Sequence, residues 1–336
     1  MRRVKLFTIC ASLMVCALAL AGCGEEYYEE DGYSYEEGYE DGYDGEYSDD
    51  GNEEGYNDSE YANQSDEYDY GETGFSGNVN YDTSEYPLGS CSEMEGTTVL
   101  VSIFIDDAQT SWSSNPSAID DALKYTGIAT DWVSKQAAAY GCSSKFIYDW
   151  KTNPDLYYEG SVGISMTDEN AVDGSSWKYI NSNVDAQALL QKYNANNIGF
   201  MFYVNTPMSN DLTSCTRNYY EGMESPYEMC YIYMFCDNEE ESPASIAHEI
   251  LHLFGAPDLY SADTNGDNYG VPQELVDELE RTQSNDIMYT TYDAKKDIAY
   301  YDKITNDFTE VDAYYVGLTG SCDFVNEWNL QPSQHR

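Results

Sequence analysis

From residue 87 onward the chain alternates short apolar runs with longer segments in which apolar positions recur every three or four residues. A run of β-branched and other apolar residues at 97–105 predicts a buried strand, and similar short runs predict three more. Segments of helical period, several of them bounded by capping residues, separate and follow these strands. The pattern predicts strands at 97–105, 145–150, 198–204 and 231–235, helices at 117–140, 185–193, 243–254, 272–281 and 309–318, and an irregular end at 323–336.

Because strands alternate with helices, we expect an α/β (α+β) fold. A mixed, twisted sheet should pack on the helix at 243–254, and a smaller lobe, mostly helical or irregular, should follow it. Residues 87–330 are long enough for one sizeable domain, with 331–336 as a short C-terminal tail.

The first 22 residues have a different pattern. Arg2, Arg3 and Lys5 precede an apolar stretch at 6–21, which is short for a membrane-spanning helix. Residues 20–23, Leu-Ala-Gly-Cys, resemble the lipobox of bacterial lipoproteins. That resemblance implies cleavage of a signal peptide at 1–22, a lipid on Cys23, and a chain anchored at the extracytoplasmic face of the cell membrane. A plain secretory signal or an uncleaved membrane helix is the alternative.

Residues 23–86 are rich in Glu, Asp, Tyr and Gly, and contain no Lys or Arg. With few aliphatic residues the segment has little from which to build a core, and its like charges repel. We expect a disordered stalk that holds the following domain away from the membrane. Cation binding, a basic partner, or cover of the active site as a propeptide are the other interpretations.

The net charge of −47 excludes a nucleic-acid partner, because the stalk holds only 23 of the 62 acidic residues and the remainder is also strongly negative.

Six cysteines remain after Cys23 and the two in the signal: Cys91, Cys142, Cys215, Cys230, Cys236 and Cys322. An even number outside the cytoplasm predicts up to three disulfide bonds of undetermined pairing. Alternatively, Cys91 blocks a metal as a latency thiolate.

Candidate chemistry concentrates in residues 248–258, His-Glu-Ile-Leu-His-Leu-Phe-Gly-Ala-Pro-Asp. Residues four apart share one helical face, so His248 and His252 can bind the same metal ion. Glu249, beside the first histidine, can accept a proton from metal-bound water. The alternative without metal binding is a pair of ordinary surface or core histidines on an amphipathic helix.

The residues around the motif support this interpretation. Ser242 is a good N-cap and Pro243 fits the first helical position. Gly255 can adopt the left-handed conformation that ends a helix, which lets the chain return Asp258 to the ion. Three protein ligands and one open position are typical of a catalytic zinc.

A second segment, Ser-Asn-Asp-Ile-Met-Tyr at 284–289, resembles the Met-turn of the metzincin zinc peptidases, and Gly-Ala-Pro-Asp-Leu-Tyr at 255–260 resembles the immune-inhibitor-A-like secreted peptidases. The resemblance implies a metzincin-like domain with one Zn²⁺ held by His248, His252 and Asp258, Glu249 as general base, and Met288 beneath the metal. Thr290 stands where some metzincins carry a tyrosine, so Tyr289 and Tyr292 are candidate stabilisers of a tetrahedral intermediate.

The resemblance also implies that an edge strand, at 198–204 or 231–235, pairs with an extended substrate. Residues 263–274 carry oxygen side chains at the positions of a calcium loop, but lack its glycine at the sixth position, so Ca²⁺ or a solvated turn are both open. A glutamate from the following helix, Glu274 or Glu278, is the rival third zinc ligand.

These patterns together predict a monomeric, membrane-anchored zinc endopeptidase that acts on a protein or peptide substrate. Two alternatives remain at this point. One is a non-catalytic surface-binding protein that keeps a metallopeptidase scaffold, and the other is a zinc hydrolase of cell-wall or glycosylated peptides.

Overall fold

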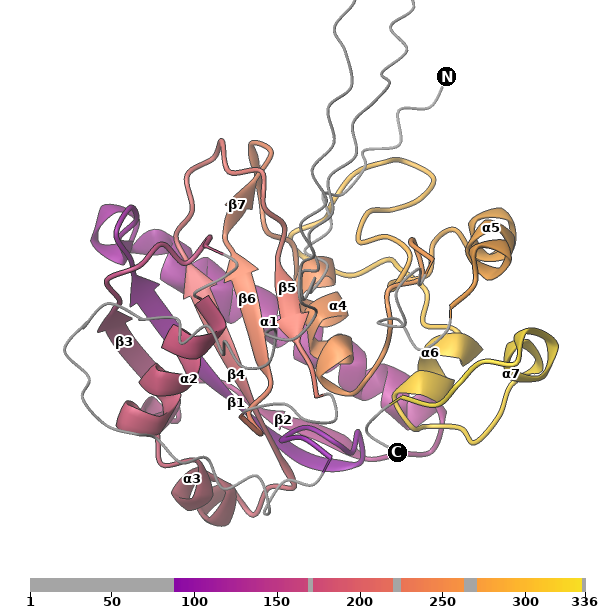
Figure 1. The fold of residues 1–336 in the computed structure, drawn as a ribbon, viewed down its shortest axis with the longest axis horizontal. Coiled ribbons are helices and arrows are strands. Elements are labelled where there is room, and N and C mark those ends of the chain that lie inside the picture. Colours follow the sequence, from indigo (N-terminus) through magenta and orange to yellow (C-terminus); the bar gives the residue numbers. More distant parts are fainter. Residues whose placement is uncertain (1–87, 169–171, 220–224, 263–270, 334–336) are drawn as a thin grey trace, which may run out of the picture. The chain divides into compact units, whose positions relative to one another are not determined.

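The computed structural model describes residues 88–168, 172–219, 225–262 and 271–333, and it confirms an α/β fold built on a mixed sheet (Figure 1). The sheet strands are β1 (Gly96–Asp106), β2 (Ser144–Ile147), β3 (Tyr157–Ser161), β4 (Asn197–Val204), β5 (Cys215–Arg217) and β6 (Met229–Tyr233), and a small hairpin pairs β7 (Phe235–Cys236) with β8 (Glu239–Glu240). The α-helices are α1 (Ser117–Ala139), α2 (Val172–Asn183), α3 (Ala186–Tyr193), α4 (Pro243–Leu253), α5 (Gln273–Thr282), α6 (Glu310–Tyr315) and α7 (Asp323–Trp328).

The sheet has the order β2-β1-β4-β6-β5, and β3 pairs with the later part of β1, beyond β2. Strands β1, β2, β3, β4 and β6 run parallel, whereas β5 runs antiparallel to β6. Strand β4 is buried along its whole length, as expected for a parallel strand covered on both faces. The mixed sheet expected from the sequence is therefore confirmed.

Helices cover both faces of the sheet. Tyr203 of β4 hydrogen-bonds through its hydroxyl to Thr126 of α1 at 2.6 Å, and Tyr231 of β6 to Ser176 of α2 at 3.0 Å. Tyr231 is in register with Phe202, the neighbour of Tyr203, so the two tyrosines point to opposite faces. Figure 1 accordingly shows α1 behind the sheet and α2 in front of it.

Helix α4 packs closely against the sheet, on the same face as α1. A Cβ at Gly199 of β4 would lie 2.9 Å from Cδ1 of Leu253 in α4, which is closer than side chains tolerate. Glycine at this position therefore brings the metal-motif helix directly onto the central strands.

Several element boundaries differ from the sequence-based expectation. Strand β6 ends at Tyr233, and the β7–β8 hairpin, turned by two left-handed residues, Asp237 and Asn238, separates it from α4. The closing helix α6 ends at Tyr315, before the predicted end at 318, because Gly317, with φ of +90°, takes the left-handed conformation that ends a helix. Helix α7 occupies part of the end expected to be irregular.

The expected edge strands are both interior strands, which corrects that prediction. Strand β4 lies between β1 and β6, and β6 lies between β4 and β5. The sheet edge next to the metal-motif helix is instead β5, a strand of three residues that contacts α4. Its apolar content is too low for it to stand out as a strand in the sequence.

No disulfide forms among the six cysteines that the structure describes, so the expected bridges are absent from it. Cys215 is in register with Tyr231, and Cys230 with Thr216, so these two cysteines point to opposite faces of the sheet although their strands are neighbours. Cys91 is buried, its backbone N–H donates to Glu228, and its sulfur lies against Gly199.

The signal, the lipidation residue Cys23, the acidic stalk and residues 263–270 of the calcium-like loop lie outside the described residues. Within the described ranges, no helix is long and apolar enough to cross a membrane.

Candidate metal centre

The helix that carries the metal motif begins and ends as its sequence predicts. The Ser242 side chain accepts a hydrogen bond from Ser245 N at 3.1 Å, and Pro243 occupies the first turn. At the other end Gly255 has φ of +89° and donates its N–H to His252 O at 2.9 Å. The reversal after Gly255 carries the chain back along the helix toward Asp258.

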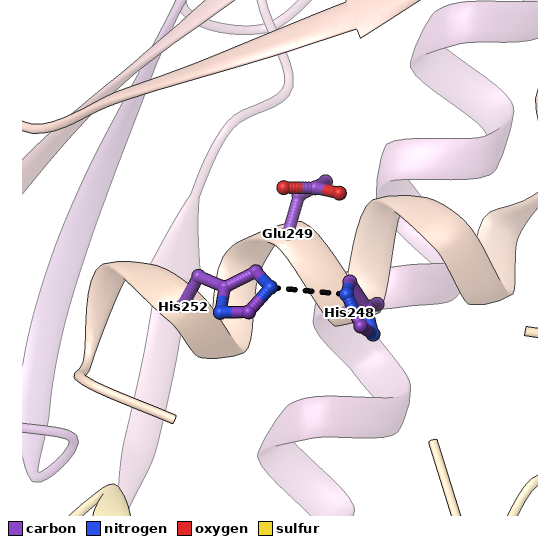
Figure 2. A group of neighbouring side chains, drawn as sticks. All are labelled: His248, Glu249 and His252. Atoms are coloured by element: carbon purple, nitrogen blue, oxygen red, sulfur yellow. Dashed lines mark hydrogen bonds between the residues drawn. The ribbon is translucent and has the colours of Figure 1, made fainter. Parts of the chain in front are cut away.

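The two histidines of α4 point toward each other (Figure 2). Their Nε2 atoms are 3.0 Å apart. Each ring is fixed by its other nitrogen, because His248 Nδ1 bonds to Ile287 O at 2.9 Å and His252 Nδ1 bonds to Ala256 O at 2.6 Å. A carbonyl can only accept, so both Nδ1 atoms carry hydrogen and both neutral rings present an Nε2 lone pair.

Asp258 completes a triangle with the two histidines. Its Oδ1 lies 3.2 Å from His248 Nε2 and 3.2 Å from His252 Nε2. That oxygen is buried and has no hydrogen-bond partner among the described residues. Three electron-pair donors therefore converge on one point, an arrangement that is repulsive unless a cation or a proton lies among them.

The size of the triangle fits a zinc ion. The three donor atoms lie 3.0 to 3.2 Å from one another, close to the separation of about 3.3 Å expected between donors that each meet a tetrahedral zinc at about 2.0–2.1 Å. Two imidazoles and one carboxylate form a donor set that zinc accepts in catalytic sites. The Nδ1 bonds to backbone carbonyls are the supporting contacts that metal-bound histidines commonly make.

A proton can take the place of a metal ion among the three donor atoms. Burial lowers the pKa of His252, but the Asp258 carboxylate outweighs that effect and raises it above the usual value. Burial acts in the opposite direction on Asp258, whose pKa is nevertheless held well below its usual range by His252 and His248. Metal binding would release the proton that His252 and Asp258 otherwise share.

Glu249 lies on the same helix with its carboxylate directed away from the line between the histidines (Figure 2). The side chain is only 4% exposed, and its Oε2 accepts a hydrogen bond from Thr216 Oγ1 at 2.8 Å. Burial raises the pKa of Glu249 to about 7, despite the opposing effects of His248 and Thr216. A carboxylate of this kind is suited to accept a proton near neutral pH.

The segment around Met288 supports two of the three candidate ligands. Ile287 O accepts from His248 Nδ1, and Met288 O accepts from Leu259 N at 2.9 Å, next to Asp258. Met288 itself is fully buried. The turn therefore joins the helix to the returning loop, whatever role the methionine sulfur has.

A cavity of about 100 Å³ opens beside His248 and Glu249. Both tyrosines proposed from the sequence, Tyr289 and Tyr292, line it, and the Tyr292 hydroxyl donates to Glu239 Oε2 at 2.6 Å. Tyr260 also lines the cavity, with its ring stacked near that of His248. The remaining lining is rich in carboxylates: Asp237, Glu239, Glu240 and Glu241 come from the β7–β8 hairpin and the residue after it, and Asp211 comes from the segment between β4 and β5.

The rival ligands lie elsewhere. Glu278 of α5 forms an ion pair with Arg281 at 2.5 Å, and Glu274 is exposed on the same helix. The Cys91 sulfur lies against Gly199 of β4, and among the described residues Cys91 is not part of the cluster of His248, Glu249 and His252. Asp258 is the carboxylate that meets both histidines.

Thr216 was not predicted from the sequence, because it reaches Glu249 from a strand 33 positions away and nothing in its local sequence signals that contact. Tyr260 was noted only as the last residue of the segment at 255–260, with no role assigned to it. Neither a search against known protein families nor a search of curated proteins found a match for this chain.

Proposed function

We propose that this protein is a zinc-dependent endopeptidase, anchored by a lipid on Cys23 at the extracytoplasmic face of the membrane. The observation that carries the proposal is the convergence of His248 Nε2, His252 Nε2 and Asp258 Oδ1 within 3.2 Å of one another, beside a buried glutamate. Two histidines without a shared ligand on a helix would not be expected to converge with a carboxylate oxygen in this way. The metzincin-like motifs of the sequence support the same conclusion.

When bound, zinc would lower the pKa of a coordinated water and polarise a substrate carbonyl. The chain's own contribution begins with Glu249, which accepts the proton of the attacking water and returns it to the leaving amine. Thr216 holds the Glu249 carboxylate in place through Oγ1. Tyr289 is the hydroxyl group in the cavity that we assign to the developing oxyanion, and Tyr292 would join it only by releasing its hydrogen bond to Glu239.

Substrate binding follows from the strand beside the cavity. Strand β5 is a sheet edge, and an extended peptide can add to such an edge through its backbone. Because Thr216 of β5 contacts Glu249, a peptide on this edge would pass close to the proposed base. An extended peptide segment, rather than a folded surface, is the substrate that this arrangement suits.

The lining of the cavity favours a basic side chain near the scissile bond. Five carboxylates line it besides Glu249, and no Lys or Arg of the described chain does. Charges of one sign within a partly enclosed space raise the local concentration of counter-charged ligands. We therefore propose a preference for substrates with Lys or Arg close to the bond that is cleaved.

Glu249→Gln tests the proposal directly. The variant keeps the size of the side chain but cannot accept the water proton, so hydrolysis of an unfolded protein such as casein should fall to background while zinc remains bound. Activity of the parent should also disappear on chelation and return with zinc. A parent that binds zinc but cleaves neither casein nor peptides would favour a binding role, whereas activity confined to cell-wall peptides would favour the narrower hydrolase.

A further inference from the structure

Two buried aspartates lie behind the turn that supports the metal centre. Asp286 precedes that turn and is 0% exposed, and Asp312 in the first turn of α6 is 1% exposed. Among the ion pairs of the described residues, none involves either carboxyl group. An ionised carboxylate is costly to bury without a cation or several donors, so two adjacent ones require a specific explanation.

Each carboxyl has one satisfied oxygen and one that is not. Asp286 Oδ1 accepts from Met288 N at 2.7 Å, and Asp312 Oδ2 accepts from Thr309 N at 2.8 Å, within a capping box. The other oxygens, Asp286 Oδ2 and Asp312 Oδ1, are buried and meet no donor in the described structure. Asp286 interacts with the Thr309 side chain and directly with Asp312, and one hydrogen held between the two carboxyl groups would satisfy both of the remaining oxygens.

We propose that Asp286 and Asp312 share one proton, and that this pair positions the turn at 286–290 against the metal ligands. The proton forms a covalent bond to Asp312 Oδ1 and a hydrogen bond to Asp286 Oδ2. The positioning role rests on the proposed function, whereas the shared proton is independent of it.

The connection from the pair to the ligands takes few steps. Asp286 fixes the backbone N–H of Met288, and the adjoining carbonyls of the turn bond to His248 Nδ1 and to Leu259 N. On its other side the turn is held by the bond from Ile287 N to Asp307 O at 2.9 Å. The Asp312 carboxyl thereby joins the start of α6 to the segment on which His248 and Asp258 depend.

Electrostatics supports the location of the proton. Burial raises the pKa of Asp286 to about 6. The pKa of Asp312 is raised further above its usual range, by burial and by the neighbouring charge of Asp286. Asp312 is therefore the group that keeps the proton at neutral pH.

Asparagine substitutions separate the shared proton from a trapped cation such as Ca²⁺. In Asp312→Asn the introduced amide can accept from Thr309 N and donate to Asp286 Oδ2, which replaces the proton but removes a cation ligand. Asp286→Asn keeps the acceptor for Met288 N, while Asp286→Ala removes it. Asp286→Asn and Asp286→Ala compare keeping and losing this acceptor at one position, and Asp312→Asn changes the partner carboxyl.

The first measurement is the infrared spectrum of the metal-free full chain at neutral pH. Burial raises the pKa of Glu249 to about 7 as well, so the comparison is made with Glu249→Gln in both chains. A carbonyl band of a buried protonated carboxyl should be present in the Glu249→Gln chain and should lose intensity when Asp312→Asn is added. A band that Asp312→Asn leaves unchanged would overturn the shared proton. So would added Ca²⁺ that raises the Tm of the parent but not of the variant, since it would show a cation between the two carboxylates.

The second measurement is zinc affinity, by competition with a chromophoric chelator. Asp286→Ala should lose about 10- to 100-fold, as expected for loss of a group that orients ligands, with Asp286→Asn and Asp312→Asn within about twofold of the parent. Parent-like zinc affinity in folded Asp286→Ala would leave the pair without a positioning role. A parent that binds no zinc would refute the proposed function, but not the infrared result.

Discussion

At the scale of single residues, the metal centre depends on hydrogen bonds that fix how each group is presented. The Nδ1 bonds of His248 and His252 to backbone carbonyls direct both Nε2 lone pairs inward. The Thr216 hydroxyl likewise fixes the orientation of the Glu249 carboxylate by donating a hydrogen bond to it. Groups that do not touch substrate therefore decide whether the groups that do touch it are oriented for reaction.

Thr216→Val tests this role for the base. The variant keeps the branched shape but removes the hydroxyl donor at 2.8 Å from Glu249 Oε2, so we expect kcat to fall about 10- to 100-fold with zinc content unchanged. Thr216→Ser keeps the hydroxyl and should retain activity near that of the parent. Equal losses in both variants would mean that the methyl group, and not the hydrogen bond, matters.

The sequence predicted the proposed ligands and base by position because spacing on a helix fixes which side chains share a face. His248, Glu249 and His252 lie on one helix, and Gly255 ends it as expected. Thr216 was not predicted, because its contact with Glu249 depends on where β5 meets α4. Asp286 lies inside the segment recognised for its methionine, but its burial beside Asp312 is a property of the folded chain alone.

At the scale of elements, long apolar runs and helices of clear period were predicted well, whereas α2 and the short strand β5 were not predicted. Strands β1 and β4 and helices α1, α3 and α5 agree with their predicted ranges to within about two residues. Strand β5 has three residues and is stabilised by its pairing with β6, so its own sequence carries little signal of a strand. Neither β4 nor β6 was recognised as interior, since pairing order depends on contacts between distant segments.

The contact between the Met288 turn and α6 makes stability depend on pH. A carboxyl whose pKa is higher in the folded chain than in the unfolded chain binds protons more strongly when folded, so its contribution is full at low pH and is lost as pH rises. For Asp286 the loss begins at about pH 4, the pKa of an unfolded aspartate, and extends to about 6, and for Asp312 it extends higher.

We therefore expect the free energy of unfolding of the metal-free parent to fall relative to that of Asp312→Asn as pH rises above about 4. One proton gives a slope of about 1.4 kcal/mol per pH unit. Denaturant unfolding of both chains across this range is the measurement. A difference between parent and variant that is constant with pH would contradict the assignment of a proton to this pair.

At the scale of the whole molecule, charge is the dominant feature. The net charge of −47 is shared between the stalk and the rest of the chain, and acidic side chains also gather around the cavity beside the candidate metal centre. Composition argues against a nucleic-acid partner, but it does not show where on the surface the charge gathers. That location follows from the β7–β8 hairpin, which brings Glu239 and Glu240 to the cavity.

Glu240→Gln tests the preference for basic substrates. The amide can still accept from the Tyr125 hydroxyl, so the variant removes charge with little change in packing. We expect kcat/KM to fall about fivefold, or about 1 kcal/mol, for a peptide with Lys or Arg near the scissile bond, and the effect should shrink at high salt. Neutral peptides should be unaffected, and Glu327→Gln on α7, which is exposed and does not line the cavity, is the matched charge control. Equal effects of the two variants would refute a local role for the cavity.

The central claim is that His248, His252 and Asp258 hold one zinc ion with a position left open. The most direct test is metal content together with zinc X-ray absorption of the purified full chain. We expect one zinc per chain with about four nitrogen or oxygen neighbours at about 2.0–2.1 Å, no sulfur, and an affinity loss in Asp258→Ala beyond the 10- to 100-fold typical of supporting contacts. A folded chain without zinc, sulfur neighbours at about 2.3 Å, or full zinc binding by Asp258→Ala would contradict the claim.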